Sequence, residues 1–370
     1  MKVLLVMDNI AVANGISSIV MNFCRSLKNI RFDFIVSTKY ADNYEAEIIS
    51  LGGKVFYMTD APSLSVSALP QIIKNAKRFM KANAGNYDVV HLHTATFCFP
   101  YLYYAKKYGV KSRVAHAHSI SFGNSKLSSV RNTLMLLPLK TLANKFLACS
   151  QTAGEKFYYP LKIKDFEVML NGISFEKYAF DLNARRDIRE EFGVGEKTVL
   201  VGHISNMTPL KNVPFAVKSF AKLHKVNPDS RLLLIGKNEL PEAVKSAIDE
   251  CGVGEWVINA GVRSDVPRCL SAMDVCLMPS ETEGLGLVAV ECQASMLPVI
   301  TSKGFPDEIY ATDICCALDY DEQLWADKAL ELSAGRLQPI DLKAAKERFD
   351  IEYVARKLAD CYVSQKGDIK

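Results

Sequence analysis

The stretch Glu-Gly-Leu-Gly-Leu-Val-Ala-Val-Glu, residues 283–291, decides the fold of this chain. It follows an apolar run at residues 275–278 and a Pro-Ser pair, so it predicts a buried strand, a glycine-broken turn and then a helix. Open α/β sheets bind phosphate-containing ligands at such junctions, because the amides and the dipole at a helix amino terminus face the anion. Glu283 and Glu291 can accept hydrogen bonds from sugar hydroxyls. Two glutamates at this spacing usually mark a solvated helix face, but the strand and turn before them favour a ligand site.

Apolar runs alternate with amphipathic stretches along the whole chain. This is the βαβ rhythm of parallel sheets, and it occurs in two series. The turn Asn171-Gly172 separates the series, so we expect an amino-terminal domain at residues 1–170 and a second domain at 171–350. The expected strands are residues 2–7, 32–37, 54–58, 89–93 and 112–116, then 199–202, 231–236, 257–261, 275–278 and 298–301.

The charge is divided unevenly between the two halves of the chain. Residues 1–180 carry 22 Lys and Arg against 11 Asp and Glu, whereas the remainder carries 23 against 30. A basic surface attracts nucleic acid, anionic lipid or a phosphorylated substrate, and it can also be a merely solvated face. Residues 126–145 are basic around an apolar centre, which suits either a bilayer surface or a buried helix broken at Pro138.

No run of eighteen apolar residues occurs, and residues 1–7 resemble a first strand rather than a signal peptide. We therefore expect a cytoplasmic protein. The ten cysteines lie mostly in apolar segments without a Cys-x-x-Cys pair, which indicates reduced core residues.

Four of the six histidines form two His-x-His pairs, His91 with His93 and His116 with His118, each at the carboxyl end of an expected strand. Alternation along a strand places each pair on one face, where it borders the ligand crevice of a parallel sheet. Satisfied structural histidines would give the same pattern. A His-x-His pair also suits a metal, but the two other histidines are poorly placed to complete a metal hydrolase, so we predict no metal site.

Two loops offer backbone amides to a phosphate. Residues 14–18, Asn-Gly-Ile-Ser-Ser, follow the first strand and open a helix, but they lack the Gly-x-Gly-x-x-Gly pattern, so NAD binding is not expected. Residues 201–212 repeat the layout with Lys211 just before a helix, where its ammonium can meet a diphosphate. A lysine that merely lies on the protein surface would give the same sequence pattern.

Together these segments resemble the retaining glycosyltransferases of family 4, especially those that build bacterial capsular and exopolysaccharides. The resemblance spans nearly the whole chain and is most specific in the Glu-x7-Glu segment after Pro-Ser. It implies the GT-B fold, an α/β architecture of two Rossmann-like domains facing each other across a cleft, and a helix in residues 351–370 that returns to the first domain. The segments that carry it are residues 14–22, 115–119, 148–150, 170–173, 202–212 and 279–300.

The resemblance also implies roles for individual residues around a nucleotide-sugar. Glu291 should bind the ribose hydroxyls, and Lys211 should neutralise the departing diphosphate. Glu283 should hold the sugar ring together with the amides of the turn and the first helical residue, namely Gly284, Leu285, Gly286 and Leu287. From the first domain, Gly15 should let a helix end approach the diphosphate.

Two further groups complete the implied site. His118 should lie beside the transferred sugar, with His116 as second choice, and Val262 and Arg263 should flank the base. The implied catalytic residues are therefore His118, Lys211 and Glu283. No metal is implied, because fixed cations and helix dipoles stabilise the diphosphate.

The partners follow from the same resemblance. We expect a nucleotide-sugar donor, UDP-linked, with no other cofactor, and a glycan acceptor that is lipid-linked. The basic first domain fits such an acceptor and peripheral contact with the inner face of an anionic membrane, and nucleic acid is not expected.

Three positions depart from the family pattern. Asn206 stands where the family carries an arginine, and it can donate a hydrogen bond but brings no charge. Asn14 and Met296 replace glycines. The first hypothesis is thus an active, metal-independent, retaining hexosyltransferase, and the second is a catalytically weakened GT-B subunit that binds nucleotide-sugar or assists an active transferase. A GT-B epimerase is a third reading, but no paired acid and base favour it.

Overall fold

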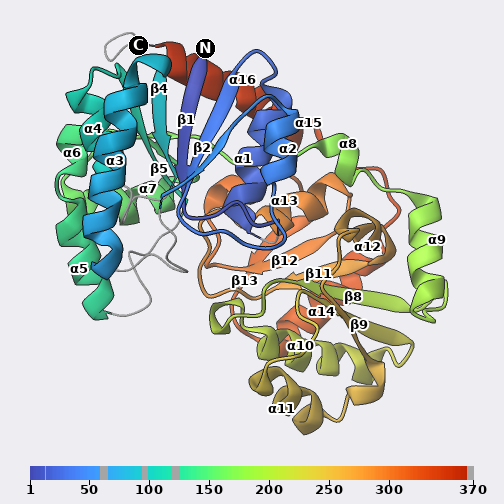
Figure 1. Ribbon diagram of the computed structural model, residues 1–370. Helices are drawn as coiled ribbons and strands as arrows, with labels where there is room; N and C mark the ends of the chain where they lie inside the picture. The colour runs from blue at the N-terminus through green and yellow to red at the C-terminus, as the bar shows by residue number, and fades with distance from the viewer. Residues whose placement is uncertain (13, 59–65, 94–98, 119–125, 365–370) are drawn as a thin grey trace. The chain divides into compact units, whose positions relative to one another are not determined.

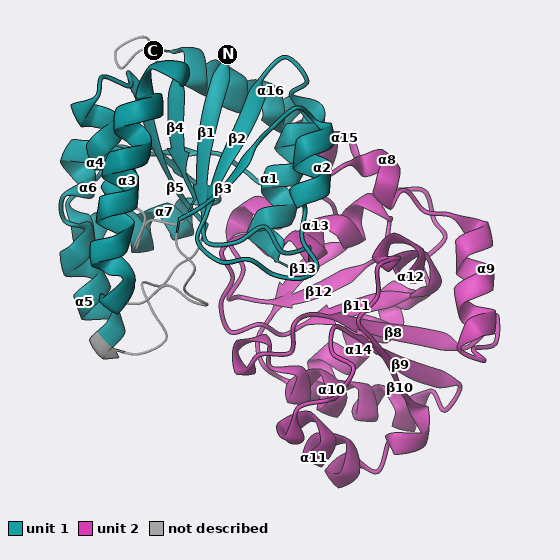
Figure 2. Ribbon diagram, viewed as in Figure 1, with its two compact units in different colours: residues 1–172, 351–370 teal, residues 173–350 magenta. Residues whose placement is uncertain are grey.

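The computed structural model describes residues 1–12, 14–58, 66–93, 99–118 and 126–364 (Figure 1). They form two compact units, coloured separately in Figure 2. Unit 1 comprises Met1–Gly172 and Ile351–Lys370, and unit 2 comprises Ile173–Asp350.

Unit 1 is built on a seven-stranded parallel sheet with the order β3-β2-β1-β4-β5-β6-β7. The first strand pairs with β2 on one side and β4 on the other, so the strand order reverses there and creates a switch point. The strands are β1 (Lys2–Met7), β2 (Arg31–Val36), β3 (Val55–Tyr57), β4 (Val89–Leu92), β5 (Ser112–Ala117), β6 (Lys145–Ala148) and β7 (Glu167–Val168).

Helices cover both faces of this sheet, because its central strands are buried on both sides and carry almost continuous apolar sequence. The last helix of the chain packs against α1 in the same unit, and Ser26 Oγ donates to Glu352 Oε1 at 2.9 Å. The helices are α1 (Gly15–Ser26), α2 (Glu45–Ser50), α3 (Leu69–Asn83), α4 (Phe99–Lys107), α5 (Lys126–Leu136), α6 (Leu139–Leu142), α7 (Gln151–Tyr158) and α16 (Ile351–Val363), with 3₁₀ turns at Val66–Ala68, Ala84–Asn86 and Tyr159–Leu161.

Unit 2 repeats this architecture with a six-stranded parallel sheet in the order β10-β9-β8-β11-β12-β13. Its strand order reverses between β8 and β11, which are hydrogen-bonded neighbours. The strands are β8 (Val199–Ile204), β9 (Ser230–Ile235), β10 (Val257–Gly261), β11 (Val275–Met278), β12 (Val299–Ser302) and β13 (Cys315–Leu318).

The helices of unit 2 pack on both faces of its sheet, and a buried ion network fixes one of them. Asp274, just before β11, accepts from Arg185 at 2.6 Å and from Arg189 at 3.2 Å, both on α9. The helices are α8 (Phe175–Tyr178), α9 (Leu182–Glu191), α10 (Val213–Val226), α11 (Glu242–Cys251), α12 (Val266–Ala272), α13 (Leu287–Ala294), α14 (Glu322–Ser333) and α15 (Lys343–Phe349), with 3₁₀ turns at Pro209–Lys211, Gly254–Trp256 and Asp307–Ile309.

The expected α/β fold with two parallel sheets is confirmed, and the ten expected strands are all present. Sequence analysis missed β6, β7 and β13. Most described cysteines are buried, as expected of core residues.

The segment at residues 126–145 is neither wholly buried nor wholly exposed. On α5 and just beyond it, Val130, Leu134 and Leu137 are exposed, and Leu134 is 62% exposed. Leu136 and Leu139 are buried in the unit 1 core. The segment therefore presents an apolar outer face. Within the described residues, no helix has the length and hydropathy needed to span a bilayer.

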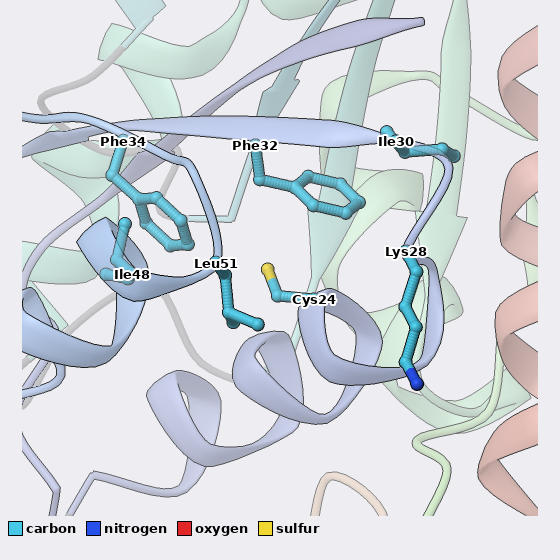
Figure 3. A pocket seen from close by; sticks show the side chains of 7 residues that line it. All are labelled: Cys24, Lys28, Ile30, Phe32, Phe34, Ile48 and Leu51. Atoms are coloured by element: carbon cyan, nitrogen blue, oxygen red, sulfur yellow. The ribbon is translucent and has the colours of Figure 1, made fainter.

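A small pocket of about 100 Å³ lies between α1, α2 and β2 (Figure 3). Phe32, Phe34, Ile48 and Leu51 surround it, and burial raises the pKa of the Cys24 thiol that faces it. A binding pocket needs several convergent polar groups to orient a ligand, and Lys28 is the one charged side chain among the residues that line this pocket.

Candidate active site

The turn between β11 and α13 places backbone amides at the carboxyl end of the unit 2 sheet. Gly286 has φ +87°, and a Cβ added there would lie 2.3 Å from the ring of Phe305, so only glycine fits. Leu287 begins α13. Among the described residues no side chain caps this helix, and its first turn carries no acid. The amide of Ala289 donates to the carbonyl of Gly286 at 3.0 Å, and the amides before it can face an anion.

Glu283 and Lys211 meet directly in this turn. Lys211 Nζ lies 2.5 Å from Glu283 Oε1, and the side chains are 23% and 11% exposed. The two residues follow β8 and β11, the neighbouring strands at the switch point. The pair places an ammonium and a carboxylate at one point, and a bound anion would compete with the carboxylate for the ammonium.

Backbone hydrogen bonds hold the loops that carry this pair. The amide of Glu281 donates to the carbonyl of Leu210 at 2.8 Å, and that of Glu283 donates to the carbonyl of Gly304 at 3.0 Å. A Cβ on Gly304 would lie 2.3 Å from the carbonyl oxygen of Glu281. The three loops after β8, β11 and β12 are thus tied together, which fixes the ion pair on a rigid frame.

Asn206 lies in the loop after β8, at the position where the family carries an arginine. Its Oδ1 accepts from the amide of Thr208 at 3.4 Å, and the next residue, Met207, is buried with φ +52°. His203 braces the loop, because its Nε2 lies 2.7 Å from Ser205 Oγ and its Nδ1 lies 2.8 Å from the carbonyl of Leu277. Burial lowers the pKa of His203 to about 4, so it is neutral. Asn206 itself is exposed and adds no charge.

Glu291 lies on α13, and it has a partner that sequence analysis missed. The hydroxyl of Tyr178 on α8 donates to Glu291 Oε1 at 2.8 Å. Burial raises the pKa of Glu291, and the Tyr178 hydrogen bond and the Lys177 charge oppose that rise. Tyr178 stands 113 residues away in sequence and shows no motif, so no sequence signal identified it.

Val262 and Arg263 follow β10, two strands away from β8. Val262 is 63% exposed, and its amide donates to Asn238 Oδ1 at 2.9 Å. The Arg263 guanidinium is held by Glu191 at 2.5 Å and Asp265 at 2.8 Å, and these hydrogen bonds raise its pKa. Val262 therefore offers an apolar surface, whereas the charge of Arg263 is neutralised by two carboxylates.

In unit 1, Gly15 begins α1 after β1. Within the described part of the chain, no atom comes within 4 Å of the position that a Cβ on Gly15 would take, which leaves its surroundings open. Asn14, where the family has glycine, caps the helix by accepting from the amide of Ser17 at 3.1 Å. One amide of the first turn is therefore already satisfied by the protein.

The two His-x-His pairs converge into one cluster. His91 and His93 come from β4 and its carboxyl end, and His116 and His118 from β5 and its end, beside them. His93 Nδ1 lies 2.8 Å from His118 Nε2. Burial lowers the pKa of His118 to about 3, so it is a neutral imidazole at physiological pH. It cannot supply a positive charge to a diphosphate.

The structure thus brings Lys211, Glu283 and residues 284–287 together in unit 2, with Glu291 eight residues further along the same segment. Val262 and Arg263 lie at the same edge of that sheet. Gly15 and His118 belong to unit 1, at the carboxyl ends of β1 and β5.

Comparison with known proteins identifies this architecture. Residues 197–334 match the family model described as glycosyl transferases group 1, and residues 13–177 match that described as glycosyltransferase family 4. EpsF of Bacillus subtilis, which is named as a glycosyltransferase, is 29% identical over 332 residues, 87% of this chain and 85% of EpsF.

Two further proteins extend the comparison. The UDP-Gal:alpha-D-GlcNAc-diphosphoundecaprenol alpha-1,3-galactosyltransferase of Escherichia coli is 28% identical over 229 residues, 58% of each chain. The crystal structure of Anabaena HepE in complex with UDP superposes with a TM-score of 0.79 at 18% identity, covering 99% of this chain and 100% of HepE. The chain is therefore a glycosyltransferase of family 4 with the GT-B fold.

Proposed function

We propose that this glycosyltransferase moves a hexose from a UDP-hexose to a lipid-linked glycan, with retention at the anomeric carbon and without a metal at the diphosphate. The observation that carries the proposal is the Lys211–Glu283 pair beside the uncapped amino terminus of α13. HepE was crystallised with UDP, and the Escherichia coli relative is named for a UDP-galactose donor and a diphosphoundecaprenol acceptor. Both support a UDP-linked donor here.

The proposed chemistry starts with the departing diphosphate. Lys211 and the first amides of α13 stabilise the negative charge that develops as the glycosidic C–O bond breaks. Glu283 accepts hydrogen bonds from sugar hydroxyls, and Glu291 does the same for ribose. The acceptor hydroxyl then attacks the same face of the sugar, and its proton passes to the leaving phosphate oxygen. From unit 1 the proposal assigns Gly15 to the diphosphate and His118 to the transferred sugar.

The second candidate function is that of a weakened, nucleotide-sugar-binding subunit that assists an active transferase. Asn206 favours it, because this position lacks the usual cation and Arg263 is already paired with two carboxylates. One missing charge-assisted hydrogen bond costs about 1.5–3 kcal/mol, which slows departure of the leaving group by roughly one to two orders of magnitude. Such a loss weakens an enzyme without abolishing its activity.

The basic charge of the first half and the apolar outer face of α5 support peripheral contact of unit 1 with an anionic bilayer. Exposed Val130, Leu134 and Leu137 can enter the headgroup region while lysines elsewhere on the unit meet anionic lipid. Such contact would bring a lipid-linked acceptor close to the enzyme at the cytoplasmic face. A capsular polysaccharide would be a product of the same chemical class as the proposed glycan.

The direct test is release of UDP from UDP-hexoses in the presence of EDTA and candidate acceptors. Lys211→Ala and Glu283→Gln should each lower the turnover number by about 10²–10³. The matched control is Lys245→Ala, which removes an exposed lysine paired with Glu239 in the same unit. Undiminished turnover in both site variants would show that the site is misplaced. Binding of UDP without turnover, rescued by a neighbouring transferase, would instead support the assisting subunit.

A further inference from the structure

The histidine cluster in unit 1 has properties that donor binding does not explain. Its four rings pack against one another: the centroids of His91 and His93 are 4.0 Å apart, and those of His116 and His118 are 4.1 Å apart. His91 and His116 stack across the two strands at 5.3 Å with an interplanar angle of 7°. Four imidazoles are thus concentrated in the interior of a domain, where polar groups ordinarily need partners.

Several of these buried nitrogens lack partners. Nε2 of His91 and Nδ1 of His118 make no hydrogen bond to any described residue, and neither nitrogen of His116 makes one of good geometry, although the backbone of Met169 interacts with that ring. His91 and His116 are almost completely inaccessible to solvent, at 0% and 3%. An unsatisfied buried polar group costs about 1–3 kcal/mol, so this concentration calls for a ligand that the described residues do not supply.

We propose that His91, His93 and His116 bind one divalent transition-metal ion of the zinc class. The donor nitrogens of these three residues lie within 4.8 Å of one another. Tetrahedral coordination with Zn–N bonds of about 2.0–2.1 Å requires nitrogens ~3.4 Å apart, so each ring needs to move by roughly 1 Å or less. We predicted no metal site because His203 and His224 are poorly placed to complete a metal hydrolase, but the adjacent strands β4 and β5 bring the two His-x-His pairs to one place.

The remaining contacts of the cluster resemble the outer partners of metal-bound histidines. The Tyr362 hydroxyl lies 2.7 Å from His91 Nδ1, which leaves the unpartnered Nε2 of that ring for the ion. His118 Nε2 lies 2.8 Å from His93 Nδ1 and can orient His93 in the same way. Outer groups of this kind fix the tautomer and the ring orientation of a ligand. Tyr362 and His118 are therefore positioning residues for the metal.

The ion would be held by unit 1 alone, and its three histidine ligands leave a fourth coordination position for water. It would join β4, β5 and, through Tyr362, the carboxyl-terminal helix α16 of the same unit. An ion enclosed by buried side chains should exchange slowly, so transferase activity during brief exposure to EDTA does not bear on it. Metal content is measured without any activity assay, so the outcome is independent of whether the proposed reaction is correct.

The test uses the full chain without a histidine tag, loaded with Co²⁺ or Zn²⁺ and separated from free metal. We expect about one ion per chain, visible-range ligand-field bands from bound Co²⁺, and no sulfur charge-transfer band. His116→Gln should abolish stoichiometric binding, and Tyr362→Phe should weaken it by about 10–100-fold while keeping all three ligands. The matched control His224→Gln alters a histidine of unit 2 that pairs with Ser230 and should bind as the wild type does.

The spectrum of the wild-type protein decides the matter even if His116→Gln fails to fold. Absence of ligand-field bands at stoichiometric Co²⁺ would overturn the proposal, and so would a cysteine-type charge-transfer band. Equal affinity in the folded wild-type, His116→Gln and Tyr362→Phe proteins would place any bound metal elsewhere.

Discussion

The hydrogen bond from Tyr178 to Glu291 should set the pH at which the protein loses affinity for UDP. In the structure, the Tyr178 hydroxyl donates to the Glu291 carboxylate at 2.8 Å and lowers a pKa that burial has raised. Tyr178→Phe removes this donor, so the hydrogen bond no longer opposes the rise in the Glu291 pKa that burial causes. A hydrogen bond to a charged group contributes about 1.5–3 kcal/mol, so its loss should raise the pKa of Glu291 further.

The sign of the effect on binding follows from the charge state. Ribose hydroxyls donate to a carboxylate, whereas a protonated carboxyl offers a weaker acceptor. Affinity for UDP should therefore fall as pH decreases through the Glu291 pKa. In Tyr178→Phe this fall should begin at a higher pH, and affinity near the alkaline end of the range should be close to that of the wild type.

Isothermal titration calorimetry with UDP between pH 5 and pH 9 measures this displacement. The phosphate of UDP titrates near pH 6, but its contribution is common to all the proteins compared. Tyr320→Phe is the matched control, because it removes a hydroxyl that donates to the carbonyl of Pro279 at 3.1 Å and leaves Glu291 untouched. An identical pH profile in Tyr178→Phe and wild type would refute the reasoning, and so would a uniform loss of affinity at every pH.

Three other changes test the site and its frame. Asn206→Arg should raise turnover by about tenfold or more if the diphosphate lacks a cation, as steady-state assays would show, and unchanged turnover would mean that another group already serves. Gly286→Ala should lower the free energy of unfolding in urea by about 2–5 kcal/mol, because strain at positive φ adds to overlap with the Phe305 ring. Gly193 also has positive φ but open surroundings, so Gly193→Ala should lower it by only about 1–2 kcal/mol. Equal losses in the two variants would contradict this reasoning. Asp274→Asn should lower the free energy of unfolding by about 3–5 kcal/mol in the same assay, because it leaves the buried charges of Arg185 and Arg189 unpaired. Asp319→Asn, which breaks an exposed ion pair, should lower it by about 0–1 kcal/mol. A small loss in Asp274→Asn would show that the buried network is dispensable.

Much of the fold could be predicted because continuous apolar runs mark strands buried on both faces. The expected bounds of β1, β10 and β11 coincide with the observed ones. β6 was missed because it begins at Lys145, the last residue of the basic, apolar segment that resembled a helix, and β13 was missed because its Cys-Cys pair indicated only core. Strands of four residues carry too few positions for a periodic signal.

The candidate site was predictable where its residues share a local motif. Glu283, Gly286 and Glu291 lie in one stretch, so the strand, turn and helix that position them could be read together. Tyr178 could not be found, because its contact with Glu291 depends on how α8 packs beside α13. The pairing of Arg263 with Glu191 over 72 residues is likewise a product of tertiary structure.

The ion pair at the centre of the site has a consequence for specificity. Lys211 and Glu283 are both largely shielded from water, so each satisfies the other in the described residues of unit 2. A bound phosphate draws the ammonium away, and the carboxylate is then left without its partner unless hydroxyl groups replace it. A nucleotide without sugar supplies the anion but not those hydroxyls. At the proposed site the pair should therefore favour a complete nucleotide-sugar over free UDP, which would help product to leave after the sugar has been transferred.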